Sequence, residues 1–466
     1  MKRKVISVLL CATMGAAMLA GCGSSSSEST SDSTDAAAED TAEATDEGTD
    51  ESAEASNTDF SGEELSILVS AGWMDNRYDE TIARFEETYD VTVDLQTIPA
   101  DQYDDLLQSK LSTDSCADIF WIQSNPFAID SVIVDPEKYC IDFTGAEWEG
   151  IMPEARKASC MSGDKLYGLQ IWHNSPEYVM VYNKTLFEEL GITEVPTTYA
   201  DFLADCDKIA AEGITPWFVP GADGWQEQLA FFQIGGVYKE ATPGLYDGLN
   251  NNTATFADNE KMLEVLEQYK ELSDKGYLGE DWIGSDSTNM SNDFGDRNIA
   301  MAMANSSFIQ QIKDDTGTED EFGLFLIPLG DNDTYPTNPA GPTMFGYKGT
   351  EHEELVKEFF NFVTTTESLQ EILDNSPAYT NLDVNDDAVE QHWLPEEEEF
   401  MASVDESKMA TPVLQTGTKY TNDYWSDFGS DMIAYCQGTM EANDVLSNMD
   451  SNRAEAAKVT GDEAWN

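Results

Sequence analysis

Tryptophans lie close to polar side chains in several short segments of this sequence. Of the ten tryptophans, Trp73 is followed by Asp75 and Trp121 is followed by Asn125. A flat aromatic ring packs well against the C–H face of a sugar ring, while nearby polar groups bind the hydroxyls at its rim. These segments therefore favour noncovalent binding of a polar organic molecule, and a carbohydrate fits the pattern.

The other tryptophan segments and one asparagine loop add residues of the same two kinds. The candidate ligand-binding residues are Trp73, Asp75, Trp121, Asn125, Trp172, His173, Glu177, Trp217, Asp223, Trp225, Gln228, Asn305 and Trp425. A carboxylate can accept from two hydroxyls, and each bond to a charged group contributes about 1.5–3 kcal/mol. Each candidate also has a structural alternative, because tryptophans pack in cores and most acidic residues are solvated. The acidic run 396–399 is expected to be exposed.

Short strands alternate with helices over most of the chain, and these elements must position the candidates. Strands are predicted at 65–69, 91–95 and 119–121, with helices at 82–89 and 103–112 between them. This order implies an α/β fold with a mostly parallel sheet flanked by helices. A second region of this kind contains strands at 179–182, 299–303 and 323–328 and helices at 199–212 and 262–275, followed by a helix at 355–360. Thr198 is the expected N-cap of the helix at 199–212.

The N-terminus has the pattern of an exported lipoprotein. A basic start precedes an apolar run that ends in Leu19-Ala20-Gly21-Cys22, which predicts a signal peptide over residues 1–21 and lipidation of Cys22. Residues 22–59 are small, polar and acidic, and are expected to form a disordered tether. The remaining 400 or so residues suggest two lobes rather than one core.

Charge and cysteine content limit the partners. The formal net charge is −66, which argues against nucleic acid and against anionic lipid headgroups as partners. With three histidines and no Cys-x-x-Cys spacing, no metal site and no cofactor are expected. Among the cysteines, Cys206 is expected to be a buried free thiol, and Cys140 with Cys160 is one possible disulfide.

Several motifs resemble those of the family 1 extracellular solute-binding proteins. The matching segments, in family order, are Ala117-Asp118-Ile119-Phe120, Asp164-Lys165-Leu166-Tyr167-Gly168-Leu169, Tyr182-Asn183-Lys184-Thr185-Leu186-Phe187, Val195-Pro196-Thr197-Thr198-Tyr199-Ala200-Asp201-Phe202, Ala300-Met301-Ala302-Met303 and Ser376-Pro377-Ala378-Tyr379. Leu169 stands where many members have proline, which affects one local turn. Each motif is short, so the resemblance depends on their shared order along the chain.

The resemblance implies a two-lobed clamp like that of maltose-binding protein, which closes around its ligand by hinge bending. Lobe 1 would comprise 60–172 plus 343–408, and lobe 2 would comprise 173–342 plus 409–466. The chain would cross between them near 172–177, 338–342 and 407–412. By family position, Trp121, Trp425, the 217–228 loop and the loop of Asn305, Ser306 and Ser307 would contact the sugar.

The resemblance also implies a role and a location. The protein would be a monomeric, non-catalytic receptor that captures a carbohydrate, specifically an oligosaccharide, and passes it to the transmembrane subunits of an ABC permease. The lipid anchor at Cys22 would hold it on the extracellular face of the cell membrane, and this anchor would be its sole membrane contact.

Two alternatives remain open from the residues alone. The same aromatic and acidic side chains suit a polyamine or another cation, whose affinity would fall steeply with salt. A surface-anchored glycoside hydrolase would need two carboxyls about 5–9.5 Å apart, and no such pair can be identified among the ninety acidic residues.

Overall fold

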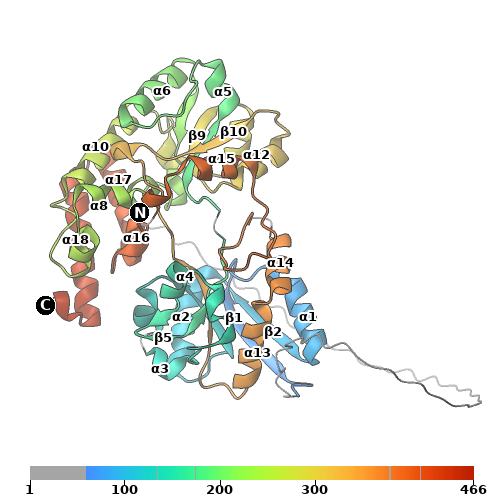
Figure 1. Cartoon of the computed structure of the whole chain (residues 1–466). Coiled ribbons are helices and arrows are strands. Elements are labelled where there is room, and N and C mark those ends of the chain that lie inside the picture. The colour runs from blue at the N-terminus through green and yellow to red at the C-terminus, as the bar shows by residue number, and fades with distance from the viewer. Residues whose placement is uncertain (1–58, 134, 174, 377–378, 410, 466) are drawn as a thin grey trace, which may run out of the picture. The chain divides into compact units, whose positions relative to one another are not determined.

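The structure, a computed structural model, describes residues 59–133, 135–173, 175–376, 379–409 and 411–465. The predicted signal peptide, Cys22 and the tether up to residue 58 lie outside the described residues. Two sheets, each flanked by helices, form the folded part (Figure 1). Within the described part of the chain, no helix has the length and apolar character that crossing a bilayer requires.

The first sheet has the strand order β2-β1-β3-β11-β6, and the second has the order β10-β7-β9-β8. Their strands are β1 (Glu64–Ser70), β2 (Thr92–Ile98), β3 (Ile119–Ser124), β6 (Gly168–Leu169), β7 (Val179–Asn183), β8 (Thr215–Phe218), β9 (Ile299–Ala304), β10 (Phe322–Phe325) and β11 (Gly341–Gly346). A short hairpin joins β4 (Met161–Ser162) to β5 (Lys165–Leu166). The strands predicted from the sequence are all present.

The helices follow the predicted order. Those before β7 are α1 (Asp79–Tyr89), α2 (Ala100–Ser112), α3 (Pro136–Tyr139) and α4 (Glu154–Ala158). Those between β7 and β11 are α5 (Lys184–Glu189), α6 (Tyr199–Ala211), α7 (Leu229–Phe232), α8 (Gly235–Ala241), α9 (Leu245–Asn250), α10 (Glu260–Asp274), α11 (Met290–Gly295) and α12 (Phe308–Thr316). The last are α13 (Glu353–Val363), α14 (Thr366–Asp374), α15 (Pro395–Ser403), α16 (Leu414–Gly417), α17 (Trp425–Cys436) and α18 (Ala442–Thr460). Thr198 caps α6 as predicted, because its side chain accepts from the backbone N–H of Asp201.

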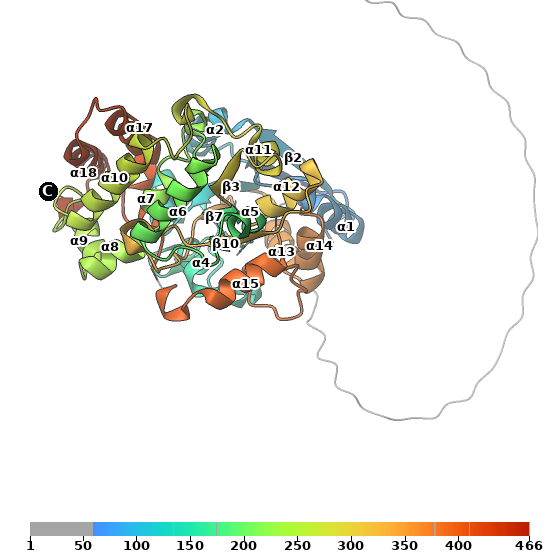
Figure 2. The same ribbon diagram turned by 90° about the horizontal axis from the view of Figure 1, so that it is seen from above.

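Strands β3, β7, β9 and β11 are buried on both faces, which is why they read as mostly apolar runs, whereas the edge strand β2 is partly exposed. In β1, Ile67 and Val69 face a core that contains α1 and α13, whereas Leu68 faces the core that contains α2. In the second sheet, α6 and α10 cover one face, and α11, α12 and α15 cover the other. The C-terminal helices α17 and α18 pack beside α10 (Figure 2).

One strand in each sheet runs against the others. β11 is antiparallel to β3 and β6, and β7 is antiparallel to β9 and β10. These are the strands by which the chain enters a sheet after leaving the other one. Because the crossing segments meet the sheets at the edge where the remaining strands end, an entering strand starts from that edge and runs in the opposite direction.

The third crossing lies earlier than the sequence analysis placed it. Val389 packs in the core of the first sheet, but Phe400 of α15 already packs in the core of the second. The interval 343–408 therefore contains a helix that belongs to the second sheet. The acidic run at the start of α15 hid this, since four consecutive glutamates show no apolar face.

That acidic run is only partly exposed, which corrects the expectation from sequence. Glu397 is fully buried, and Glu396 forms an ion pair with Lys313 of α12 at 2.7 Å. Glu398 and Glu399 are exposed.

The cysteines within the described residues are all free thiols. Cys206 is buried, as predicted. The possible Cys140–Cys160 disulfide does not form, because the two thiols pack in the cores on opposite faces of the first sheet. Burial raises the pKa of both thiols.

Candidate ligand-binding site

A cavity of about 280 Å³ opens at the carboxyl ends of β8 and β9. Its lining residues are Tyr178, Trp225, Gln226, Ser287, Met290, Met303, Ala304, Asn305, Ser307, Phe308 and Gln311. Three predicted residues, Trp225, Asn305 and Ser307, are therefore brought together here. Loops beyond the carboxyl ends of strands are the usual place for ligands in open α/β sheets.

Two aromatic rings form one wall of this cavity. Trp225 and Tyr178 meet edge to face, with ring centroids 5.9 Å apart. Tyr178 lies directly before β7 and has a left-handed backbone, with φ of 51°. That conformation is rare for a bulky residue and tends to persist where function requires it.

The loop that carries Trp225 is held by its own polar groups. The Asp223 carboxylate accepts from Gln226 Nε2 at 3.0 Å and from the Ser287 backbone N–H at 3.4 Å. Gln228 is buried and donates from Nε2 to the Trp225 carbonyl at 2.6 Å. Of these predicted ligand residues, Asp223 and Gln228 thus support the wall rather than line it.

Two buried amide oxygens in this region lack a hydrogen-bond donor from any residue that the structure describes. Neither Asn305 Oδ1 nor Gln228 Oε1 has a hydrogen-bond partner among the described residues. An unpaired buried acceptor costs about 1–3 kcal/mol. Of these two residues, Asn305 lines the cavity.

The cavity lining is uncharged. The described lining residues provide three aromatic rings, at Tyr178, Trp225 and Phe308, together with amides, hydroxyls and methionines, but no acidic or basic side chain. Such a surface provides ring faces and hydrogen-bonding groups without a counter-ion for a charged ligand. It suits a neutral polyhydroxylated molecule.

Glu227 lies behind this wall rather than in it. It is fully buried, and its Oε2 has no partner among the described residues. Burial raises the pKa of its carboxyl, and the negative charge of Asp223 adds to the rise. Its carboxyl packs directly on Gly429 of α17, where a Cβ would come within 2.2 Å of Glu227 Oε1.

The first crossing brings together two other predicted residues, His173 and Glu177. His173 Nε2 lies 3.2 Å from Glu177 Oε1, and Asn338 of the second crossing donates to Glu177 Oε2 at 3.0 Å. Burial acts to raise the pKa of Glu177, but the His173 ring and both hydrogen bonds outweigh it, and the pKa is lowered. Both residues line a second cavity, of about 240 Å³.

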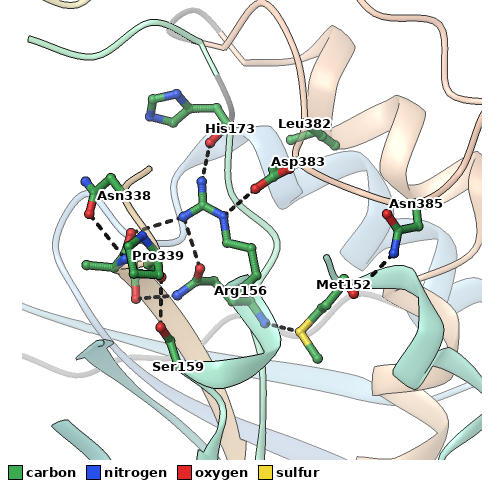
Figure 3. A network of polar contacts seen from close by, with 12 residues as sticks. Met152, Arg156, Ser159, His173, Asn338, Pro339, Leu382, Asp383 and Asn385 are labelled. Carbon is green, nitrogen blue, oxygen red and sulfur yellow. Dashed lines mark hydrogen bonds and ion pairs between the residues drawn. The ribbon is translucent and has the colours of Figure 1, made fainter. Parts of the chain in front are cut away.

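Arg156 of α4 ties the crossing segments together. Its guanidinium donates to the His173 carbonyl at 2.8 Å, to the Ala340 carbonyl at 3.2 Å and to Asp383 at 2.8 Å. Figure 3 shows these bonds fanning out to three separate segments, while the His173 ring points away from the guanidinium. Arg156, His173 and Asp383 all line the second cavity, so this network forms part of its wall.

Asp75 and Trp172 belong to a cluster that adjoins His173, because the rings of Trp172 and Tyr379 lie 5.2 Å and 4.6 Å from the His173 ring, centroid to centroid. Asp75 pairs with the buried Arg77 at 2.6 Å, and Arg77 lies over the rings of Tyr379 and Trp172, at 4.2 Å and 5.7 Å from their centroids. Half-buried Trp73 packs against Tyr103, a residue outside the predicted set.

The other candidates do not line the described cavities. Trp121 and Trp217 are fully buried in the cores, where Trp121 contacts Tyr78. Asn125 is buried and accepts from the Phe127 backbone N–H. Trp425 begins α17 and packs, partly buried, on the second core.

Several cavity residues were missed from the sequence. Tyr178 and Gln226 each adjoin a residue that was selected, and could have been found by extending the segments by one position. Met290, Met303 and Gln311 carry no local signal, because helices and strands distant in sequence bring them together.

Comparisons with known proteins agree with this architecture. A family model described as bacterial extracellular solute-binding protein matches residues 71–370. A multiple sugar-binding protein of Streptococcus mutans is 26% identical over 248 residues, which cover 48% of this chain and 58% of that protein. A putative binding protein of Brucella abortus is 22% identical over 312 residues, or 67% of this chain and 74% of the relative.

Solved structures share the fold. A putative binding protein of Bacillus subtilis in an open conformation has a TM-score of 0.69 at 14% identity, covering 87% of this chain and all of its own. A sugar transporter protein of Bacillus licheniformis, in complex with stachyose, has a TM-score of 0.65 at 15% identity and covers 84% of this chain and all of its own. At these identities the similarity establishes the fold.

Proposed function

Because the chain belongs to the family of bacterial extracellular solute-binding proteins, we propose that it is a non-catalytic receptor that captures a neutral carbohydrate. The family consists of substrate-binding proteins and not of enzymes. The ligand is an oligosaccharide, which the receptor delivers to the transmembrane subunits of an ABC permease.

The observation that carries this proposal is the uncharged lining of the cavity at β8 and β9. Trp225 and Tyr178 provide ring faces, and Asn305 provides a buried amide oxygen without a partner among the described residues. A sugar presents C–H faces and hydroxyl donors that match both features. A polyamine would instead need carboxylates in contact with its amines, and the described lining contains none.

The names of similar proteins support the same ligand class. The Streptococcus mutans relative is a multiple sugar-binding protein, and the Bacillus licheniformis structure contains stachyose. The cavity volume of about 280 Å³ accommodates part of such a molecule. We propose that the remainder contacts the Trp73, Asp75 and Trp172 region of the first sheet as the two lobes close.

The export features complete the proposal. The signal peptide over residues 1–21, the lipid at Cys22 and the acidic tether to residue 59 would hold a monomeric receptor at the extracellular face of the cell membrane. This is where a permease receives its substrate.

A ligand screen tests the proposal directly. The chain from Phe60 onward is screened by thermal shift against mono- and oligosaccharides, polyamines and amino acids, and hits are titrated by calorimetry at low and high salt. We expect a group of oligosaccharides to bind with a Kd that barely changes with salt. A ligand at a hundred times its Kd stabilises by about 2.7 kcal/mol, which is readily detected.

Variants locate the site. Trp225→Ala is expected to weaken the sugar Kd about two- to tenfold, since a contact with an aromatic ring is worth about 0.5–1.5 kcal/mol and 1.4 kcal/mol is about a factor of ten. Trp465→Ala, a tryptophan near the C-terminus that donates to the Asn250 carbonyl, serves as the matched control and leaves the Kd unchanged. Binding of polyamines alone, with a steep loss in salt, would refute the carbohydrate ligand. Release of shorter sugars from a bound oligosaccharide would refute the non-catalytic role.

A further inference from the structure

A buried carboxylate at the start of α15 contacts the loop that lines the cavity. Glu397 is 0% exposed, although the residues on either side are half-buried or exposed. Lysine and arginine are not among the groups that hydrogen-bond to it. Such a burial is costly unless every lone pair is engaged.

Three donors engage it, from three segments. Glu397 Oε1 accepts from the Ser306 hydroxyl at 2.5 Å and from the Thr380 hydroxyl at 2.9 Å. Glu397 Oε2 accepts from the backbone N–H of Leu394 at 2.9 Å, which caps the N-terminus of α15.

Ser306 is the central residue of the binding loop. Its neighbours Asn305 and Ser307 both line the cavity, while Ser306 itself is fully buried beneath it. The backbone N–H of Ser306 donates to the Pro176 carbonyl in the first crossing, at 2.9 Å. The loop is therefore fixed at two points, one on the crossing and one on Glu397.

Thr380 links Glu397 to the first crossing by a second route. Its hydroxyl lies 2.7 Å from the Ser175 hydroxyl. A hydroxyl has one proton, and Thr380 gives its own to Glu397, so the Ser175 hydroxyl donates to Thr380. The order of bonds runs from Ser175 through Thr380 to Glu397 and then to Ser306.

We propose that Glu397 is a positioning residue for ligand binding, which holds the loop of Asn305, Ser306 and Ser307 in its binding geometry and fixes it to the first crossing. This proposal depends on the proposed function for its consequence, since the loop is a binding loop only if the cavity binds the sugar. The position of the loop itself can be tested without any ligand.

The chemistry of the side chain makes the proposal specific. Only a carboxylate of this length offers acceptors to two hydroxyls on one oxygen and to a backbone N–H on the other. Glu397→Gln keeps the length and one acceptor, but turns the other oxygen into a donor that faces an N–H or a hydroxyl. Glu397→Ala removes both acceptors and leaves the three donors unpaired.

Hydrogen exchange of the unliganded chain from Phe60 onward is the first test. In Glu397→Ala we expect amide exchange at least about tenfold faster at the loop 305–308, at residues 380–382 and at the Ser175 segment. Glu398→Ala, at the next and exposed position of the same helix, is the matched control and leaves these rates unchanged. In Glu397→Gln the exchange rates of these segments are expected to lie between those of Glu397→Ala and Glu398→Ala.

Exchange that rises only within α15 would overturn the proposal, because it would show that Glu397 merely caps its own helix. Equal rates in all three segments for Glu397→Ala and Glu398→Ala would overturn it as well. A chain of Glu397→Ala that is unfolded in solution is detected by circular dichroism, and the comparison of Glu397→Gln with Glu398→Ala then decides.

Binding of stachyose, or of whichever oligosaccharide the screen selects, is the second test. Glu397→Ala is expected to weaken the Kd at least about tenfold and Glu397→Gln by less, with the partial rescue that a positioning role predicts. If the unvaried chain binds no sugar, the proposed function fails while the exchange result still stands. If it binds sugar and Glu397→Ala binds equally well, only the positioning role fails.

Discussion

Two glutamates close to the cavities, the half-buried Glu177 and the fully buried Glu227, have opposite surroundings. Glu177 is held by His173 and Asn338, and its pKa is lowered below the ordinary value of 4.5. Glu227 has an oxygen without a partner among the described residues, and its pKa is raised above 4.5. The same side chain therefore contributes to stability with opposite dependence on pH, according to its neighbours.

For Glu177 we expect stability that is lost in acid. Because its folded pKa lies below 4.5, its contribution is full above about pH 4.5 and disappears as the pH falls through the folded value. Glu177→Gln should lower the free energy of unfolding by about 1–3 kcal/mol at neutral pH, and the deficit should shrink in acid. Urea unfolding from about pH 7 to about pH 3 measures this.

The exposed Glu188 of α5 provides the control for that series. Glu188→Gln should have the same free energy of unfolding as the unvaried chain at every pH. A deficit in Glu177→Gln that is constant with pH would contradict the stabilising role of its ionised form.

For Glu227 the expected pH dependence is reversed. Its folded pKa is raised, so ionisation costs stability as the pH rises above 4.5. Glu227→Gln should therefore have a higher Tm than the unvaried chain at about pH 8, and this advantage should vanish near pH 4.5. Scanning calorimetry at both pH values checks the difference, and a Tm advantage that is larger in acid would contradict the expected ionisation.

At the scale of elements, α4 is a short helix whose importance lies in one side chain. Arg156 binds the carbonyls of His173 and Ala340 and the carboxylate of Asp383, and so joins the first crossing, the second crossing and the segment after α14. Its side chain is 5% exposed. This guanidinium thus joins the crossings together with the Asn338–Glu177 hydrogen bond and the backbone bonds between Thr337 and the 411–413 segment.

Removal of that guanidinium should destabilise the folded protein strongly. Arg156→Ala is expected to lower the free energy of unfolding by about 3–5 kcal/mol, because it leaves buried carbonyls and one carboxylate without a partner. Arg156→Lys should recover little of this lost free energy of unfolding, since an ammonium cannot reproduce the planar set of donors. Urea unfolding measures both.

Lys157 follows on the same helix and pairs with Glu149 at 2.5 Å. Lys157→Ala is the matched control, with an expected change below about 1 kcal/mol for a pair near the surface. If Arg156→Ala and Lys157→Ala lowered the free energy of unfolding equally, this would contradict the role of Arg156 as a link between crossings.

At the scale of the whole molecule, the cavity at β8 and β9 lies at the edge from which the crossings leave the second sheet. Tyr178 illustrates this arrangement, because it lines the cavity and immediately precedes β7. Motion of the first crossing would therefore move Tyr178 in the cavity wall directly. The hinge closure that we propose would therefore move this wall of the cavity.

The proposed anchor is a property of the whole chain and has its own test. Full-length protein expressed in a Gram-positive host is expected to enter the detergent phase on phase partition, because stable anchoring needs more than one acyl chain. Cys22→Ser should move the protein to the aqueous phase. Cys11→Ser, within the predicted signal peptide, is the control and should leave it in the detergent phase.

The sequence alone determined the order and type of the elements. The periodicity of Leu65–Val69 and of the helix containing Phe85, and the cap at Thr198, are local properties that neighbouring residues set. The motifs in family order likewise identified the class of protein. The predicted elements are found in the structure because a buried strand or helix face needs the same local pattern of apolar residues wherever the element packs.

Only the tertiary structure decided which side chains reach the cavity. Trp121, Trp217 and Trp225 look alike in the sequence, yet the first two fill cores and the third lines the cavity. Glu397 and Glu398 are adjacent, yet one is fully buried and the other is exposed. Local sequence sets the period of an element, but its rotation and its partners are set by segments far along the chain, such as Ser306 and Thr380, that pack against it.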